Sequence, residues 1–274
     1  MSLLFRRRDR GGRSFAPRLM IGLIFAAIAF GSYYFGTESF DNPVTGRTQR
    51  VALSPKEEIA LGLNSVPEME RQFGGLHVDS KLQQKIDQIG KRLVEANPLV
   101  HQSPYYFEFH LLGDPDTVNA FALPGGQVFI TYGLLKLLKT DDEIAGVLGH
   151  EVIHVVGRHS NEQMAKAQLS QGLVGAVVMA GGQDYGNTAG QLAQFVSQLT
   201  NTSYGREDEL ESDKLGVRIM KGAGYDPNAM ITVMEVLEQA AGGNSPPEFL
   251  STHPNPGHRI ERIRQEIANA AGPE

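Results

Sequence analysis

The sequence of 274 residues contains no cysteine. Disulfide bonds and a lipid-modified N-terminal cysteine are therefore excluded, and exported proteins of this size can do without disulfides. A basic surface is also missing from most of the chain. Residues 1–18 carry six arginines and one acidic residue, which leaves the remainder with a net charge of −11 against −6 for the whole chain. An acidic body argues against a nucleic-acid partner, which requires a basic footprint.

The N-terminal region predicts a membrane anchor. After the basic arm of residues 1–18, residues 19–35 (LMIGLIFAAIAFGSYYF) are uncharged. As a helix they would span roughly 25 Å, slightly less than the ~30 Å hydrocarbon core of a bilayer. Arginines before an apolar span favour a cytoplasmic N-terminus, so we expect one span in a bacterial inner membrane and a body facing the periplasm. The alternatives are a signal peptide cleaved near residues 27–29, with secretion to the periplasm, and a mitochondrial location.

The body is predicted to be α+β, mainly helical with a small β-sheet. Residues 36–53 mix glycine, proline, threonine and asparagine and are expected to be a linker; the folded domain is expected over 54–270. Apolar residues 168–182 are too few to span a bilayer, so we expect a buried or lid helix, with a membrane-dipping segment as the alternative. Caps, apolar periodicity and alternation predict the elements: helices at 54–72, from 79, from 140 past 158, and at 189–200, 206–222, 227–240 and 256–270; strands at 105–112, 119–123 and 127–131.

The residues HEVIH, from His150 to His154, predict a metal site. Side chains four apart on a helix are separated by about 40° after one full turn, so both imidazoles face the same way. Two neutral imidazoles one turn apart form half of a tetrahedral zinc site. Glu151 lies about 100° round the helix, close enough to act as the general base without ligating the metal.

A catalytic zinc ion needs a third protein ligand. The acidic segment REDELESD, residues 206–213, supplies the candidates. Glu209 and Asp213 are one turn apart on one face, so we expect Glu209 as the ligand and Asp213 as the acceptor that orients a ligating imidazole. Glu211 points roughly 200° away from Glu209 and remains the alternative if the helix is irregular.

These motifs resemble a known family of zinc metallopeptidases. HEVIH and REDELESD, with NAFALPGG upstream and STHPNPGHRI downstream, resemble the family that contains the bacterial HtpX protease, the mitochondrial Oma protease and the type-one CAAX prenyl endopeptidase, and within it the periplasmic BepA- and LoiP-like members. The resemblance covers roughly residues 43–268. It implies a gluzincin-like zincin domain, one Zn²⁺ per chain and a ligand role for Glu209. Ser212 stands where alanine is usual, and Gly205 where serine is usual.

Two further segments suggest contacts with substrate. Asn119, Ala120, Phe121, Ala122 and Leu123 precede a Pro-Gly-Gly turn and suit an edge strand that binds an extended polypeptide through its backbone; an ordinary hairpin is the alternative. His253 could be a structural histidine. In the resembled family this histidine and Arg259 lie near the active site. They could stabilise the oxyanion, or His253 could occupy the fourth zinc position in a latent state.

The sequence therefore predicts a membrane-tethered zinc endopeptidase, and the resemblance implies quality control of misfolded or unassembled envelope proteins. The hypothesis from a different class is a chaperone or assembly factor that binds clients through the edge strand and rarely cleaves them. A prenyl-peptide protease is disfavoured, because that class resembles multi-span membrane proteins and this sequence offers one convincing span. No feature of the sequence sets an oligomeric state.

Overall fold

The computed structural model describes residues 15–181, 203–242, 247–254 and 258–271. The predicted helix at 189–200 lies outside these residues. The body begins with helix α2 (Pro55–Gln72), which starts where the sequence places a capping box: the Ser54 hydroxyl accepts from the Glu57 N–H, and the Glu57 carboxylate accepts from the Ser54 N–H. Helices α3 (Ser80–Ala96) and α4 (Pro98–His101) follow, each capped by the side chain before it, Asp79 and Asn97.

A three-stranded sheet packs on these helices. Strand β5 (Gln127–Thr131) lies between β3 (Glu108–Leu112), which is parallel to it, and β4 (Ala120–Leu123), which is antiparallel. The two strands predicted at 119–123 and 127–131 therefore pair as neighbours, and β4 is an edge strand of this sheet. Gly125 has φ +88°, and a Cβ there would lie 2.4 Å from the Ile59 Cα, so the turn between β4 and β5 requires glycine in order to pack on α2.

The strand predicted at 105–112 is shorter than expected. It begins at Glu108, where its pairing with β5 begins opposite Gln127, the first residue of β5 after the Pro-Gly-Gly turn. The Tyr105 hydroxyl turns inward and donates to Glu58 on α2, and Tyr106 is 82% exposed. Tyr105 is thus buried beside the Glu58 carboxylate and lies before the residues that pair with β5.

Helix α6 (Asp141–Val156) crosses the centre of the body and is capped by the Thr140 hydroxyl. The prediction that it continues past Arg158 is wrong. Gly157 ends the helix, Arg158 has φ +56°, and helix α7 (His159–Gly181) starts in a new direction. The Arg158 side chain forms a buried ion pair with Glu58 and donates to the Leu53 carbonyl, which stabilises the break.

The remaining helices close the body around α6. These are α9 (Arg206–Gly222), α10 (Ala229–Ala241), the short α11 (Phe249–Thr252) and α12 (Arg259–Ala271). Helices α3, α9 and α10 and strand β4 pack on α6, and α12 packs on α9. Fourteen of the sixteen residues of α6 are buried, so this helix holds its side chains within the main hydrophobic core.

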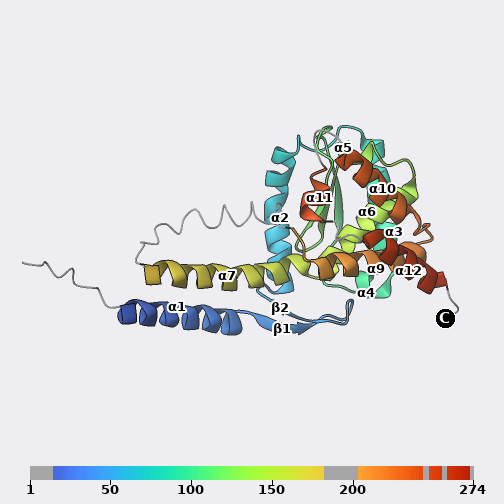
Figure 1. Cartoon of the computed structure of the whole chain (residues 1–274). Helices are drawn as coiled ribbons and strands as arrows, with labels where there is room; N and C mark the ends of the chain where they lie inside the picture. The colour runs from blue at the N-terminus through green and yellow to red at the C-terminus, as the bar shows by residue number, and fades with distance from the viewer. Residues whose placement is uncertain (1–14, 182–202, 243–246, 255–257, 272–274) are drawn as a thin grey trace, which may run out of the picture.

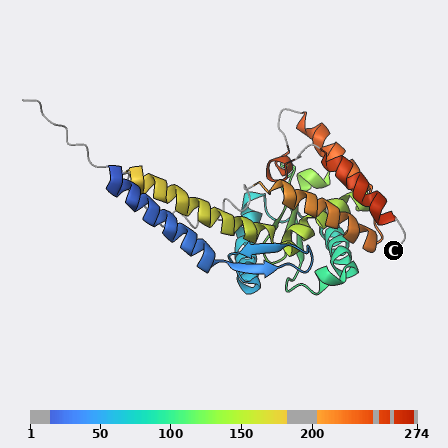
Figure 2. The same cartoon turned by 60° about the horizontal axis from the view of Figure 1, so that its bottom comes forward.

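Residues 38–51 form a two-stranded ribbon, and residues 15–36 form a helix that packs along α7; these two helices are called the stalk. Strands β1 (Glu38–Asp41) and β2 (Thr48–Val51) pair antiparallel, so the prediction of an irregular linker over 36–53 is wrong. The Asn42 side chain accepts from the backbone of the turn and donates to the Val156 carbonyl, which docks the ribbon on the end of α6. Helix α1 (Phe15–Gly36) and α7 then extend from the body side by side (Figures 1 and 2).

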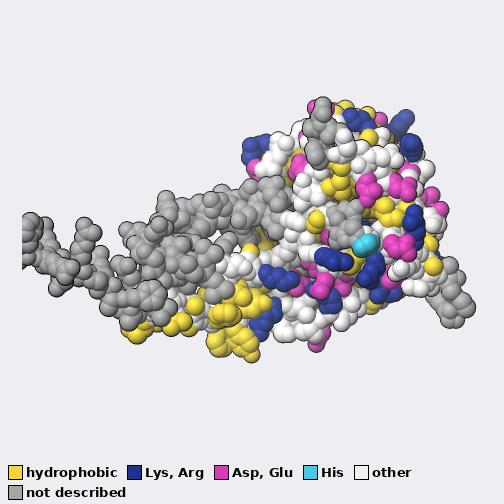
Figure 3. Space-filling model, viewed as in Figure 1, with side chains coloured by type: hydrophobic (Ala, Val, Ile, Leu, Met, Phe, Trp, Pro, Cys, Tyr) yellow, Lys and Arg dark blue, Asp and Glu magenta, His cyan; other side chains and the backbone are white. Residues whose placement is uncertain are grey.

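Both apolar segments identified in the sequence lie in the stalk. Residues 19–35 lie within α1, and residues 168–181 lie within α7 beside it, rather than within the body as a buried or lid helix. Apolar side chains gather along the described part of α1 (Figure 3), including the exposed Leu23, Ile28 and Phe30. Measured by length and mean hydropathy, none of the helices in the described ranges qualifies as a membrane span.

Candidate metal centre

Helix α6 places the two predicted imidazoles side by side. His150 and His154 are buried, with exposed fractions of 3% and 1%. Their Nε2 atoms lie 3.0 Å apart, because residues one turn apart share a face of the helix. Helix α9 brings Glu209 to the same point: one carboxylate oxygen lies 3.4 Å from His154 Nε2 and the other 3.5 Å from His150 Nε2. Glu211, the alternative ligand, is not in this group.

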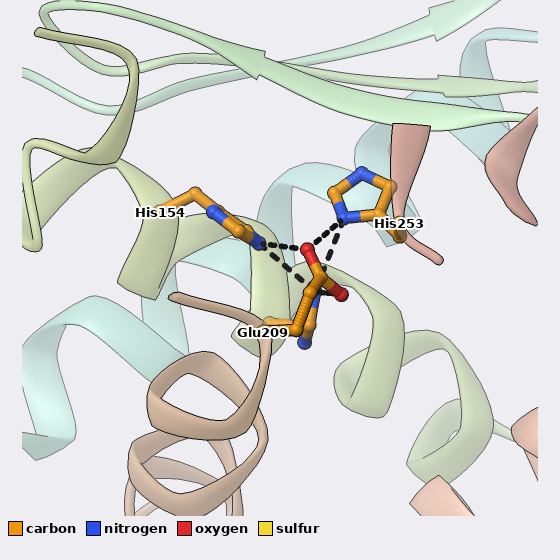
Figure 4. A group of neighbouring side chains, drawn as sticks. His154, Glu209 and His253 are labelled. Atoms are coloured by element: carbon orange, nitrogen blue, oxygen red, sulfur yellow. Dashed lines mark hydrogen bonds and ion pairs between the residues drawn. The ribbon is translucent and has the colours of Figure 1, made fainter. Parts of the chain in front are cut away.

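His253, at the end of α11, completes the cluster. Its Nδ1 lies 3.1 Å from a Glu209 oxygen and 3.3 Å from His150 Nε2. His150, His154, Glu209 and His253 each offer one ligand atom within 4.8 Å of the others, and Figure 4 shows the side chains converging on one point. The ring of Phe249 stacks on His253 at 4.3 Å, which fixes the imidazole in this direction.

The surroundings of Glu151 show that a metal ion fits the cluster. Its side chain is completely buried, and neither carboxylate oxygen has a hydrogen-bond partner in the described part of the chain. The closest basic atom is His253 Nε2, 3.4 Å from Oε1. A buried carboxylate without partners is costly unless a cation or a ligand completes the site. Two imidazoles, one carboxylate ligand and this unpartnered carboxylate fit a single zinc ion.

Asp213 and Arg259 lie beside the first histidine. The Asp213 carboxylate lies 3.1 Å from His150 Nδ1, on the side of the ring opposite the cluster. Arg259, with an exposed fraction of 1%, donates twice to Asp213, at 2.7 Å each, and lies 2.9 Å from Glu209. All of these guanidinium contacts hold carboxylates in place. Arg259 therefore links Glu209 to Asp213, the carboxylate that contacts His150, and it also donates to the His253 carbonyl at 3.5 Å.

The charges of the site shift its pKa values in different directions. Burial raises the pKa of Glu151, so this carboxylate holds a proton more readily than an ordinary glutamate. Burial lowers the pKa of His154 well below its usual range and keeps the imidazole neutral. Burial also opposes protonation of His150, but the hydrogen bonds and charges of Asp213 and Glu209 raise its pKa to about 9. For Glu209, burial is outweighed by His253 and the other imidazoles, which lower its pKa.

Two residues that contact His154 were not predicted from the sequence. The Tyr204 ring stacks on His154 at 3.9 Å, and its hydroxyl lies 2.9 Å from the Ser160 hydroxyl. His159 Nδ1 lies 2.9 Å from His154 Nδ1. Five-residue spacing on a continuous helix would have turned His159 away; the glycine before Arg158 was the one local signal of a helix end.

Strand β4 lies beside the metal helix. Ala122, Leu123 and Pro124 lie close to His154 and Arg158, with no space for a water molecule between them. All four residues of β4 are buried, as is Asn119, whose side-chain oxygen has no hydrogen-bond partner among the described residues. The predicted substrate strand is thus next to the cluster, in a closed arrangement of the site.

Most of the chain is similar to known proteins. Residues 80–267 match peptidase family M48. The chain is 30% identical to the mitochondrial metalloendopeptidase OMA1 of Schizosaccharomyces pombe, over 89% of this chain and 71% of that protein. It is also 30% identical to the beta-barrel assembly-enhancing protease of Escherichia coli K12, over 89% of this chain but 51% of that protein. A similar match, 31% identical, covers 74% of OMA1 from Saccharomyces cerevisiae.

Proposed function

The chain belongs to peptidase family M48, and we propose that this zinc metallopeptidase cuts exposed segments of misfolded or unassembled envelope proteins. One observation carries the chemical part of the proposal: two imidazoles of α6 and the Glu209 carboxylate of α9 converge within 4.8 Å of one another beside the unpartnered Glu151. His150, His154 and Glu209 would hold the ion, which leaves one position open to substrate when His253 withdraws.

Glu151 is proposed as the general base. When bound, zinc supplies a Lewis acid that polarises the scissile carbonyl and makes a water molecule more acidic. Glu151 takes the proton of the attacking water on its carboxylate and later delivers it to the nitrogen of the leaving amine. Burial, which raises the pKa of Glu151, suits a group that must both accept and return a proton near neutral pH.

His253 is proposed as a latent fourth ligand. Its Nδ1 lies within hydrogen-bond distance of both Glu209 and His150, so the imidazole occupies the position that substrate would need. The complete burial of His253 and Glu151 agrees with a closed, inactive arrangement. The oxyanion role considered for Arg259 has less support, because its guanidinium is engaged by Asp213 and Glu209.

Substrate is proposed to bind in extended form along β4. This strand forms an edge of its sheet, and its last residues lie close to His154. An extended peptide would pair with the backbone of residues 119–123 and lay its scissile bond across the metal. Since β4 is buried in the closed arrangement, binding requires the same opening that releases His253.

The envelope location is proposed from the stalk and the relatives. Apolar α1 follows a basic arm in the sequence and projects from the body, which suits an anchor in a membrane with the body on the periplasmic side. The bacterial relative is named for enhancing beta-barrel assembly and the fungal one for mitochondria. Quality control in the bacterial envelope is the reading that combines these observations.

The function is tested by cleavage of an unfolded client such as reduced casein. We predict zinc-dependent cleavage that a chelator abolishes and added zinc restores. Glu151→Gln should retain zinc but lose cleavage by about 10²-fold or more, because no general base remains. Glu207→Gln, an exposed residue of α9, is the control and should match the wild type. Binding of the client without zinc-dependent cleavage would instead support the chaperone hypothesis.

A further inference from the structure

His159 is a buried histidine that the proposed chemistry does not use. It is fully inaccessible to solvent and is the first residue of α7, directly after the break at Gly157 and Arg158. Its Nδ1 lies 2.9 Å from His154 Nδ1, and its Nε2 lies 3.0 Å from a carboxylate oxygen of Glu211. The ring thus bridges a proposed zinc ligand and an acidic residue of α9.

The geometry fixes where the protons lie. His154 presents Nε2 to His150 and Glu209, so Nε2 is the atom that would hold the metal. A neutral imidazole that ligates through Nε2 carries its hydrogen on Nδ1. This N–H can donate only to a bare nitrogen on His159, which must then carry its own hydrogen on Nε2. That hydrogen points to Glu211, so both N–H donors in this series, one on His154 and one on His159, have an acceptor.

The series of contacts from His154 through His159 and Glu211 ends at the N-terminal ribbon. Arg47, at the end of the turn before β2, lies 3.3 Å from the same Glu211 oxygen and 3.1 Å from Asp208. It also pairs with Glu162 on α7 at 3.1 Å. Arg47 therefore ties the ribbon to α7 and α9 around His159, and it lies outside the residues 80–267 that match the family.

The two proposed zinc histidines thus have parallel supports. His150 contacts Asp213, which in turn accepts from Arg259. His154 contacts His159, which in turn contacts Glu211, and Glu211 pairs with Arg47. We propose that His159 is a positioning residue that orients His154 and fixes its tautomer for metal binding, with Glu211 and Arg47 holding His159. The proposal rests on the proposed function, because it assumes that His154 ligates zinc.

Gly157 gives independent support. Its φ of −69° is open to any residue, so the backbone does not require glycine here. A Cβ at this position, however, would lie 2.5 Å from His159 Nε2 and 2.8 Å from the Ile153 carbonyl oxygen. The glycine leaves room for the His159 ring to approach His154 and Glu211.

The test measures zinc affinity of the full chain in detergent by competition with a chromophoric chelator. His159→Phe keeps an aromatic ring but removes both hydrogen bonds, and we expect zinc to bind about 10–100-fold more weakly. His159→Gln can accept from His154 and donate to Glu211, so it should recover most of this loss. Glu211→Gln should weaken zinc binding less than His159→Phe, and its control Glu207→Gln should have no effect.

A spectroscopic readout separates positioning from packing. With cobalt(II) in place of zinc, the ligand-field spectrum of His159→Phe should shift, whereas that of His159→Gln should resemble the wild type. Unchanged affinity and spectrum in a folded His159→Phe variant would overturn the inference. If that variant does not fold, His159→Gln and Gly157→Ala decide. The inference requires near-normal zinc affinity in His159→Gln and weakened affinity in Gly157→Ala, and normal affinity in both would overturn it. A wild type that binds no zinc would instead reject the proposed function itself.

Discussion

At the scale of single residues, the acidic run of α9 is sorted by helix geometry. Glu209 faces the imidazole pair, and Asp213, one turn later, faces His150. Glu211 faces His159, and Asp208 faces Arg47. Each of these carboxylates therefore has at least one basic partner, as burial of several charges in one place requires. Three of the partners are shared: Arg47, His150 and Arg259 each contact two of the carboxylates.

His253 yields a prediction about latency. We expect His253→Ala to raise the cleavage rate of an unfolded client several-fold, because the imidazole that occupies the substrate position is removed. The exposed His258, also near the start of α12, is the control, and His258→Ala should leave the rate unchanged. Rates are measured with zinc-loaded protein. A fall in rate for His253→Ala, with zinc content unchanged, would favour a role in stabilising the oxyanion.

The sequence was sufficient to predict the residues whose positions follow from a regular helix. His150 and His154 share a face at a spacing of four, and so do Glu209 and Asp213; the structure brings all of them together. It was not sufficient for His159 and Tyr204, which reach His154 from outside α6. Their positions depend on a helix break and on tertiary packing, which local periodicity does not encode.

At the scale of elements, the break between α6 and α7 depends on a buried charge pair. Arg158 adopts φ +56° and places its guanidinium 2.7 Å from Glu58, which also accepts from the Tyr105 hydroxyl at 2.7 Å. These contacts join α2, the residues before β3 and the end of α6. Tyr105, which the alternation in the sequence placed in the strand, lies outside β3 and contacts this pair instead.

The pair makes stability depend on pH. Burial raises the pKa of Glu58 despite Arg158 and Tyr105. The folded state therefore binds this proton more tightly than the unfolded state does. The contribution of Glu58 to the free energy of unfolding is therefore lost progressively as pH rises from the ordinary glutamate pKa of about 4.3 through the raised pKa of the folded state.

Urea unfolding of the wild type and Glu58→Gln over this pH range tests the assignment. We predict that the difference in free energy of unfolding, wild type minus variant, decreases as pH rises through the window. Glu57→Gln on the same helix turn is the control: hydrogen bonds with Ser54 lower the pKa of the exposed Glu57, so the difference for this variant should not decrease as pH rises. A difference that increases with pH would show that the ion pair with Arg158 outweighs burial.

At the scale of the whole molecule, the body and the stalk have different surfaces. The body buries its apolar side chains around α6, whereas α1 carries exposed ones, among them Leu23, Ile28 and Phe30 (Figure 3). Exposed apolar patches of this kind mark contacts with a membrane or another protein. The sequence indicated the apolar runs of α1 and α7 separately; that they lie side by side depends on tertiary packing.

Flotation with liposomes tests the membrane contact. The full chain should float with vesicles, and replacement of Leu23, Ile28 and Phe30 by serine should leave it in the soluble fraction, because the buried apolar area that drives insertion is lost. Val78→Ser removes a similarly exposed apolar residue from the body and should still float. Equal flotation of the triple variant would show that α1 is not the anchor.

The central claim is that side chains from α6 and α9 together hold one zinc ion. Metal analysis of the purified full chain tests it most directly. The account predicts about one zinc per chain in the wild type and in Glu151→Gln, and far less in folded His150→Ala, His154→Ala and Glu209→Ala. Zinc absent from the folded wild type, or retained in full after loss of either imidazole, would contradict it.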